Sequence, residues 1–230
     1  MKSLTSALFA LALGLCVSSC SSVFGPTVSG QQDGHDYVDL GLPSGTLWAT
    51  SNIGANKPDA NGFYFAWGET SAKNSFDWTN YKLSNGSDTR TKVTKYCVND
   101  RKGEVDNKRS LEAADDAATA NWGGKWIIPS HEAWEELMNG CDWEWVRDYE
   151  GTGIDVKMGR SKSNGNTIVL PFAGYYNGEN LMKNEGMYWT STLYETDSHQ
   201  AFTVRVYTHN MNSTNVNRKL GMSVRAVIGK

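Results

Sequence analysis

Apolar and polar residues alternate along most of the second half of the chain. Ile154, Val156 and Met158 alternate with polar neighbours, and Asn164-Gly165 then provides a two-residue hairpin turn. Further alternating or aromatic strands are expected at 143–145, 167–170, 186–190, 202–207 and 222–228. Because a period of two places every second side chain on the same face, these runs predict an antiparallel sheet with one buried face.

The first half of the chain predicts shorter strands that are separated by glycine and proline. We expect strands at 37–40, 46–49 and 62–68, the last of them aromatic and bounded by glycines. Residues 70–108 are polar and rich in turn-forming residues, so they are predicted to form long loops with little regular structure.

Two short helices are predicted in the middle of the chain. Ser110 is placed to cap a helix over 111–121. Ser130 is placed to cap a second helix over 131–139, and Gly140 follows as its end. The apolar residues of this second segment repeat at helical spacing, which indicates a face that packs into the core.

The first 20 residues have the pattern of an export signal. Lys2 is followed by an apolar run too short to span a bilayer, and the string V-S-S-C that ends at Cys20 resembles a bacterial lipobox. We therefore expect residues 1–20 to be a signal peptide, with Cys20 lipidated. An ordinary secretory signal with a chance cysteine is the alternative. Residues 21–34 are expected to be a flexible tether, and 35–230 a single domain.

This signal sequence predicts a protein of the outer membrane that is held there by its lipid anchor alone. No apolar run after Cys20 is long enough for a membrane helix. Surface export of bacterial lipoproteins often uses acidic residues directly after the lipidated cysteine, and none follow Cys20 here. Both the cell surface and the periplasmic face of the membrane therefore stay open. The net charge is −3 and there is no basic stripe, which argues against a nucleic-acid partner.

Two cysteines remain in the predicted domain. An oxidising envelope favours a disulfide between Cys97 and Cys141, and two separate buried thiols are the alternative. With no histidine pair nearby, the two cysteines are poor evidence for a metal site.

Six strings in the chain resemble the Fibrobacter succinogenes major paralogous domain, which is common in envelope proteins of Bacteroidetes. They are YVDLGLPSGTLWAT (37–50), GFYFAWGET (62–70), DDAATANWGGKWIIPSHEAWEEL (115–137), IVLPFAGY (168–175), YWTST (188–192) and GMSVRAV (221–227). The resemblance implies a C-type-lectin-like fold of the α+β class, a twisted antiparallel sheet with two short helices and long loops.

A more distant resemblance links residues 126–137 to the formylglycine-generating, sulfatase-modifying enzymes. Their catalytic cysteines lie in the C-terminal part of the domain, and this chain has no cysteine after Cys141. None of the four histidines pairs with another at ligand spacing, and no nucleophilic-serine motif occurs. We therefore expect a non-enzymatic protein, and an enzyme of this fold stays as an alternative.

No cofactor is expected, although calcium stays open because many C-type lectins bind it. The sugar-site signature of those lectins is absent here. Oxygen ligands could still come from Asn99-Asp100 or Asp106-Asn107, although most such clusters are ordinary loop residues.

The segment from Tyr194 to Asn217 is the predicted ligand face. Its polar and aromatic residues suit adaptable recognition, and its four asparagines at 210, 212, 215 and 217 are expected to crowd one short loop. The candidate ligand-binding residues are Tyr194, Glu195, Asp197, His199, Tyr207, His209, Asn210, Asn212, Asn215 and Asn217.

The expected ligand is a glycan or a protein. In C-type-lectin-like proteins altered by diversity-generating retroelements, the variable residues lie in this same region. The resemblance therefore implies that this face is diversified, whereas an ordinary polar loop is the simpler interpretation. A structural role in the envelope or in a fimbria is a further alternative.

Overall fold

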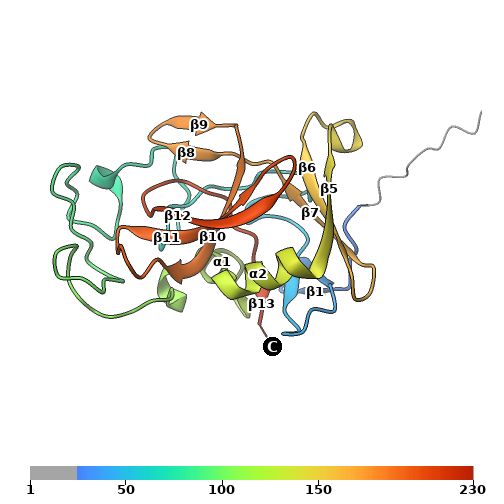
Figure 1. The fold of residues 1–230 in the computed structure, drawn as a ribbon, viewed down its shortest axis with the longest axis horizontal. Coiled ribbons are helices and arrows are strands. Elements are labelled where there is room, and N and C mark those ends of the chain that lie inside the picture. Colours follow the sequence, from blue (N-terminus) through green and yellow to red (C-terminus); the bar gives the residue numbers. More distant parts are fainter. Residues whose placement is uncertain (1–24, 230) are drawn as a thin grey trace, which may run out of the picture.

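The computed structural model describes residues 25–229. The predicted signal peptide, the lipidation site at Cys20 and the start of the predicted tether lie outside the described residues. Most of the described chain forms antiparallel sheets, and the helices are few and short (Figure 1). This content is consistent with an α+β or a mainly-β fold.

The largest sheet joins the two ends of the described chain. Its strands are β1 (Gly30–Gln32), β2 (His35–Asp39), β3 (Leu47–Ala49), β13 (Val227–Ile228) and β4 (Trp126–Ile127), in that spatial order. Each strand runs antiparallel to its neighbours. The last strand of the chain therefore lies between one of the first strands and the middle of the sequence.

The tether predicted over 21–34 is wrong for its second half. Gly30 to Gln32 form strand β1, and the Thr27 backbone N–H donates to the Thr167 carbonyl at 2.9 Å. Polar and glycine-rich composition suggested a linker, but backbone pairing with β2 and with residue 167 fixes this segment. The fold thus begins before His35.

The second half of the chain forms three smaller antiparallel sheets, as the alternation predicts. One contains β10 (Gly186–Leu193), β11 (Gln200–Val206) and β12 (Met211–Asn217), and another contains β8 (Tyr175–Asn177) and β9 (Asn180–Met182). The third contains β5 (Cys141–Val146), β6 (Val156–Ser161) and β7 (Thr167–Pro171). Asn164 and Gly165 do lie in the loop that joins β6 to β7, but this loop is longer than the predicted two-residue turn. The last pair of the ladder is Arg160 with Thr167, and only Gly165 of the two has a positive φ, of 77°.

The second predicted helix is confirmed almost residue for residue. Helix α2 spans His131–Gly140, and the Ser130 side chain accepts a hydrogen bond from the Ala133 N–H. Trp134 and Leu137 are fully buried. The helix contacts β10, β11 and β12, so its apolar face covers that sheet.

The first predicted helix begins later than expected. A 3-10 turn, η2 (Ala113–Asp115), precedes α1 (Ala117–Trp122), and Asp116 rather than Ser110 is the cap. Ser110 instead forms a backbone bridge with Thr192. The Asp116 carboxylate accepts from the N–H groups of Ala118 and Thr119, and it also accepts from Ile128 in the next segment.

The aromatic strand predicted at 62–68 is not a strand, and the predicted final strand is reduced to β13. In the first segment only Phe65 makes a bridge, to Met222, and Gly62 and Gly68 have positive φ values. The second segment is nevertheless buried, and so are Phe65, Ala66 and Trp67 of the first, whereas Phe63 is exposed. The apolar pattern therefore predicted most of the burial correctly, although outside β13 the backbone of these segments makes single bridges rather than ladders.

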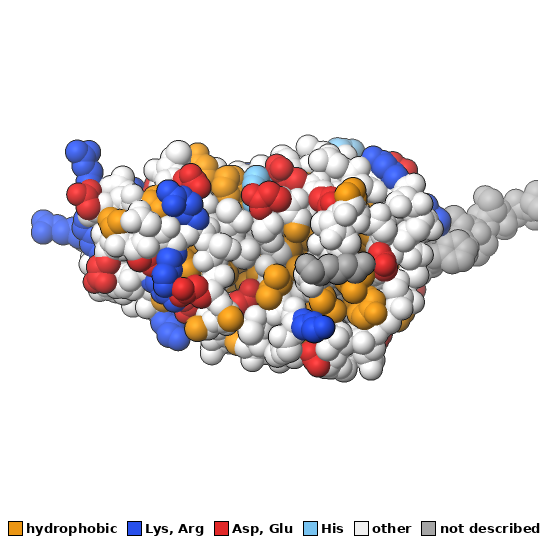
Figure 2. Space-filling view, turned by 90° about the horizontal axis from the view of Figure 1, so that it is seen from below, with side chains coloured by type: hydrophobic (Ala, Val, Ile, Leu, Met, Phe, Trp, Pro, Cys, Tyr) orange, Lys and Arg blue, Asp and Glu red, His pale blue; other side chains and the backbone are white. Residues whose placement is uncertain are grey.

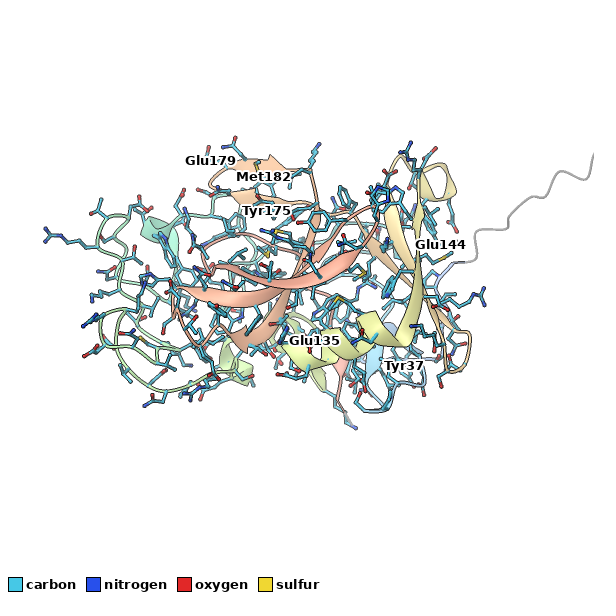
Figure 3. The ribbon with its side chains drawn as sticks, in the orientation of Figure 1. Tyr37, Glu135, Glu144, Tyr175, Glu179 and Met182 are labelled. Atoms are coloured by element: carbon cyan, nitrogen blue, oxygen red, sulfur yellow. The ribbon has the colours of Figure 1, made fainter. Side chains whose placement is uncertain are left out.

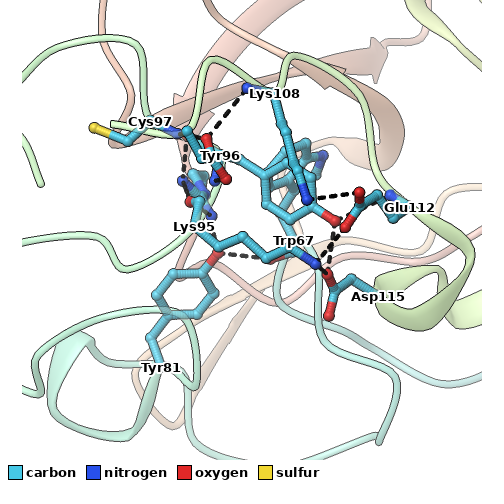
Figure 4. A network of polar contacts seen from close by, with 10 residues as sticks. Trp67, Tyr81, Lys95, Tyr96, Cys97, Lys108, Glu112 and Asp115 are labelled. Atoms are coloured by element: carbon cyan, nitrogen blue, oxygen red, sulfur yellow. Dashed lines mark hydrogen bonds and ion pairs between the residues drawn. The ribbon is translucent and has the colours of Figure 1, made fainter. Parts of the chain in front are cut away.

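The long loops predicted over 70–108 are present, with one 3-10 turn, η1 (Trp78–Asn80), among them. Arg218 joins this region to the core. Its guanidinium donates to the Tyr81 hydroxyl and to the carbonyls of Lys95, Tyr96 and Ser198. Figure 4 shows the polar contacts around Lys95, which also pairs with Glu112 and Asp115.

The loop region also carries many charged side chains of both signs (Figure 2). Seen from below the view of Figure 1, Lys and Arg side chains gather at the end that these loops form (Figure 2). Hydrophobic side chains are also visible on the same face in Figure 2, several of them close together away from the loop end.

The predicted disulfide between Cys97 and Cys141 is wrong. Both are buried free thiols. They belong to two different hydrophobic clusters, Cys97 with Trp67 and Tyr96 and Cys141 with Trp134 and Leu137. Each side chain is used for packing within its own cluster, and the Cys97 Sγ also lies 3.1 Å from the Asn99 carbonyl oxygen.

None of the helices between residues 25 and 229 is long and apolar enough to cross a membrane.

A third 3-10 turn, η3 (Tyr149–Gly151), completes the helical elements of this range.

Candidate ligand-binding cleft

A cleft of about 410 Å³ opens where three elements meet: α2, the β5–β6 hairpin and the β11–β12 hairpin. In Figure 3, Glu135 marks the α2 side and Glu144 marks β5. The cleft is lined by Glu135, Met138, Asn139, Trp143, Lys157, His209, Asn210, Met211 and Ser213.

Helix α2 forms one wall because its opposite face is committed to the core. With Trp134 and Leu137 buried, Glu135 and Asn139 are turned toward the cleft or its rim. The Glu135 carboxylate lies 3.3 Å from Nε2 of His131, whose ring stacks on Phe202 of β11 at 4.1 Å. These contacts hold the helix at a fixed place on the β10–β12 sheet.

Trp143 of β5 forms an aromatic wall. Its ring lies over Gly159 of β6, where an added Cβ would come within 2.7 Å of a ring carbon. The indole N–H donates to the Met138 carbonyl at 3.0 Å. The half-buried ring is therefore held from both sides while it still lines the cleft.

Lys157 of β6 lies at the base of the cleft with only 2% of its surface exposed. Its ammonium donates to the Thr208 carbonyl at 2.9 Å. Among the described residues, no carboxylate lies within ion-pair distance of it. Burial lowers the pKa of Lys157 from its ordinary value because the charged form is poorly solvated there.

Ser213 of β12 lines the same cleft. Its hydroxyl oxygen is buried and has no hydrogen-bond partner. His209 and Asn210, in the turn between β11 and β12, are exposed at the rim. The cleft thus combines a buried cation, a free hydroxyl, side-chain amides and one aromatic ring.

The predicted ligand-binding residues do not form one surface, because the structure divides them between the two ends of a seven-residue strand pair. Strands of this length hold their ends about 20 Å apart. Tyr194, Glu195, Asp197 and His199 lie before β11, at the end where Asn217 closes β12. Tyr207, His209, Asn210 and Asn212 lie at the other end.

Several side chains at the first end already have partners within the protein. Glu195 pairs with Arg109, and Asp197 pairs with Lys102. The Tyr194 ring packs edge-on against Phe202, and His199 lies against Trp78.

At the second end, His209 and Asn210 line the cleft. Tyr207 does not, because its hydroxyl lies 3.4 Å from Nη1 of Arg205, whose side chain belongs to the opposite face of the sheet. The expectation that four asparagines share one loop is wrong. Asn212, Asn215 and Asn217 are part of strand β12, and the Asn215 amide bonds the side chain of Gln200.

Lys157, Trp143 and Ser213 were not predicted as site residues. The alternation around Lys157 suggested an outward position opposite Val156 and Met158. Strand β6 is instead the middle strand of its sheet and is covered on both faces. Charged residues are rarely buried in this way. The burial of Lys157 follows from how the sheets pack, which the local sequence pattern does not show.

No group of three His, Cys, Asp or Glu side chains within the described residues is arranged to hold a metal ion. The two clusters considered for calcium use their oxygens locally. The Asp106 carboxylate accepts from the backbone N–H groups of Tyr96, Cys97 and Lys108. The Asn99 side-chain oxygen accepts from the Arg101 N–H.

Fold and cleft together define a β-rich domain with an open polar cleft between two of its sheets. Residues 157–227 match the model of a family described as a domain of unknown function, DUF8237. Lys157 and the β11–β12 hairpin fall inside the matched region, whereas α2 and Trp143 fall outside it. Neither a curated protein nor a solved structure matches the chain.

Proposed function

We propose that this protein is a lipid-anchored envelope protein that binds a glycan without chemically changing it. The observation that carries the proposal is the cleft between α2, β6 and β12. It presents a firmly held indole ring beside amide, hydroxyl and ammonium donors. Aromatic faces pack on the apolar faces of sugar rings, and fixed polar groups of this kind select their hydroxyls.

The C-type-lectin-like fold is part of the proposal. Support comes from the six strings that resemble the major paralogous domain and from the architecture. Two short helices lie on antiparallel sheets, and β13 pairs with β3, so the two ends of the domain meet. Long loops at one end are also consistent with that fold.

The direct test is binding of the full-length protein, purified in detergent, to a broad glycan array. It is run once with calcium and once with a chelator. We expect selective binding to a small set of related glycans, and Trp143→Ala should reduce the signal at least tenfold. Tyr175→Ala, which replaces a half-buried aromatic residue away from the cleft, is the control. Absence of selective binding in both conditions would refute the glycan proposal.

The lipid anchor is tested separately. Cys20→Ala should move the protein from the membrane fraction to the soluble fraction and remove the diacylglycerol mass. Cys16→Ala is a matched control because it lies outside the V-S-S-C string and should leave both unchanged. Membrane retention of Cys20→Ala would refute anchoring at this residue.

A protein ligand is the second candidate, and the edge strand β12 favours it. This strand pairs only with β11 in the described chain, and it leaves Asn212 and Asn217 exposed. An outer strand with varied polar residues suits protein recognition, including by a diversified face. A negative glycan array combined with a partner crosslinked to Asn212 would favour this candidate.

A further inference from the structure

The buried ammonium group of Lys157 has fewer hydrogen-bond acceptors within the described residues than it has hydrogens to donate. An ammonium group has three hydrogens to donate, and burial without partners is costly. Within the described residues, its one acceptor is the carbonyl of Thr208. Two donor positions therefore remain for whatever enters the cleft that Lys157 lines.

Ser213 provides a second, independent observation at the same place. Its hydroxyl is buried in the cleft lining and has no hydrogen-bond partner. It comes from β12, whereas Lys157 comes from β6, so residues of two separate sheets that have unused donors line one cleft. Two such donors suit a group with two acceptor oxygens.

The charges around the cleft favour a ligand with a single negative charge. Lys157 is the buried cation, and the other titratable groups in the lining are Glu135 on α2 and His209 in the β11–β12 turn. The Glu135 side chain is 52% exposed at the rim and lies beside His131. One buried cation below one solvated carboxylate favours a monovalent anion over a doubly charged phosphate.

We propose that Lys157 and Ser213 bind the carboxylate of an acidic sugar, such as a uronic acid, while Trp143 packs against the sugar ring. This inference rests on the proposed glycan-binding function and names the class of its ligand. The ammonium and the hydroxyl each donate to one carboxylate oxygen. The amides of Asn139 and Asn210 are placed for the sugar hydroxyls.

The test compares trigalacturonate with the same trisaccharide after its carboxyl groups have been reduced to alcohols. Both are titrated into the full-length protein at pH 7. We expect the reduced trisaccharide to bind at least tenfold more weakly. Lys157→Met should abolish the preference for the acid, and Ser213→Ala should weaken acid binding about three- to tenfold. Lys183→Met removes an exposed lysine outside the cleft and should change nothing.

The outcomes separate the two proposals. Equal binding of acidic and reduced trisaccharides, or an acid preference that survives Lys157→Met, refutes the carboxylate site and leaves glycan binding intact. Binding of neither trisaccharide refutes the carboxylate site, and a negative glycan array then refutes glycan binding as well. If Lys157→Met does not fold, the Ser213 variant and the two ligands still decide the question.

The pH dependence gives an independent readout. Because burial lowers the pKa of Lys157 below the ordinary 10.5, its ammonium loses its proton at a lower pH than an exposed lysine does. Affinity for trigalacturonate should therefore fall as the pH rises from 8 toward 10.5. Carboxylates and imidazoles ordinarily titrate below this range. A constant affinity across it would contradict the role of Lys157.

Discussion

Two arginines are completely buried, and both are held mainly by backbone carbonyls rather than by carboxylates. Arg218 bonds two carbonyls of the loop region and that of Ser198. Arg225 bonds the carbonyls of Ala49, Thr50 and Val169 as well as the side chain of Asn52. The Arg218 guanidinium also lies 4.6 Å from the Trp67 ring. A planar group with five donors can join chain segments that form no strand ladder with each other.

Replacing Arg218 should therefore destabilise the fold strongly. Arg218→Met leaves several buried carbonyls without a donor, so we expect the free energy of unfolding to fall by at least about 3 kcal/mol. Arg109→Met removes a half-exposed arginine paired with Glu195 and should cost about 1 kcal/mol or less. Urea unfolding followed by tryptophan fluorescence measures both, and equal losses would contradict the bridging role.

The two thiols make a second prediction at the residue scale. Burial raises the pKa of Cys141 to about 11, so only about one molecule in a thousand carries its thiolate at pH 8. Mass spectrometry after iodoacetamide should show Cys97 and Cys141 unmodified in the folded protein. Both should be alkylated in denaturant without reductant. Protection that persists in denaturant until a reductant is added would reveal a disulfide.

At the scale of elements, the caps of the two helices differ in what they join. Ser130 bonds one N–H at the start of α2, whereas Asp116 bonds two at α1 and a third at Ile128 beside β4. Asp116→Ala should therefore cost about 2–4 kcal/mol and Ser130→Ala about 1 kcal/mol. Thermal unfolding of the two variants compares them, and a larger loss for Ser130→Ala would contradict this view.

The sequence predicted best those elements whose hydrogen bonds and packing residues lie close together in the chain. Helix α2 has its cap and apolar stripe in sequence, and Asn164-Gly165 marks the position of the β6–β7 loop, although not its length. The start of α1 was missed because the Asp116 carboxylate also bonds Ile128, a contact made only in the folded chain. The same reason explains the cleft: His209 and Asn210 belong to a polar turn, whereas Lys157 becomes a site residue only when two sheets meet.

At the scale of the whole molecule, β13 completes the central sheet. Val227 and Ile228 pair with β3 on one side and β4 on the other. Deletion of 227–230 should leave the sheet in two parts and produce a chain without a cooperative unfolding transition. Deletion of 229–230 alone removes no strand residue and should fold normally. Circular dichroism during heating distinguishes the two, and cooperative melting of the longer deletion would contradict this role.

The position of β13 also has a consequence for the order of events in the cell. A secreted chain that is threaded through an export channel from its N-terminus delivers Val227 and Ile228 after nearly everything else. Contacts this far apart in sequence form late, because the intervening chain must first be brought together. For a chain exported as proposed, the domain therefore completes its fold only after β13 has paired with β3 and β4.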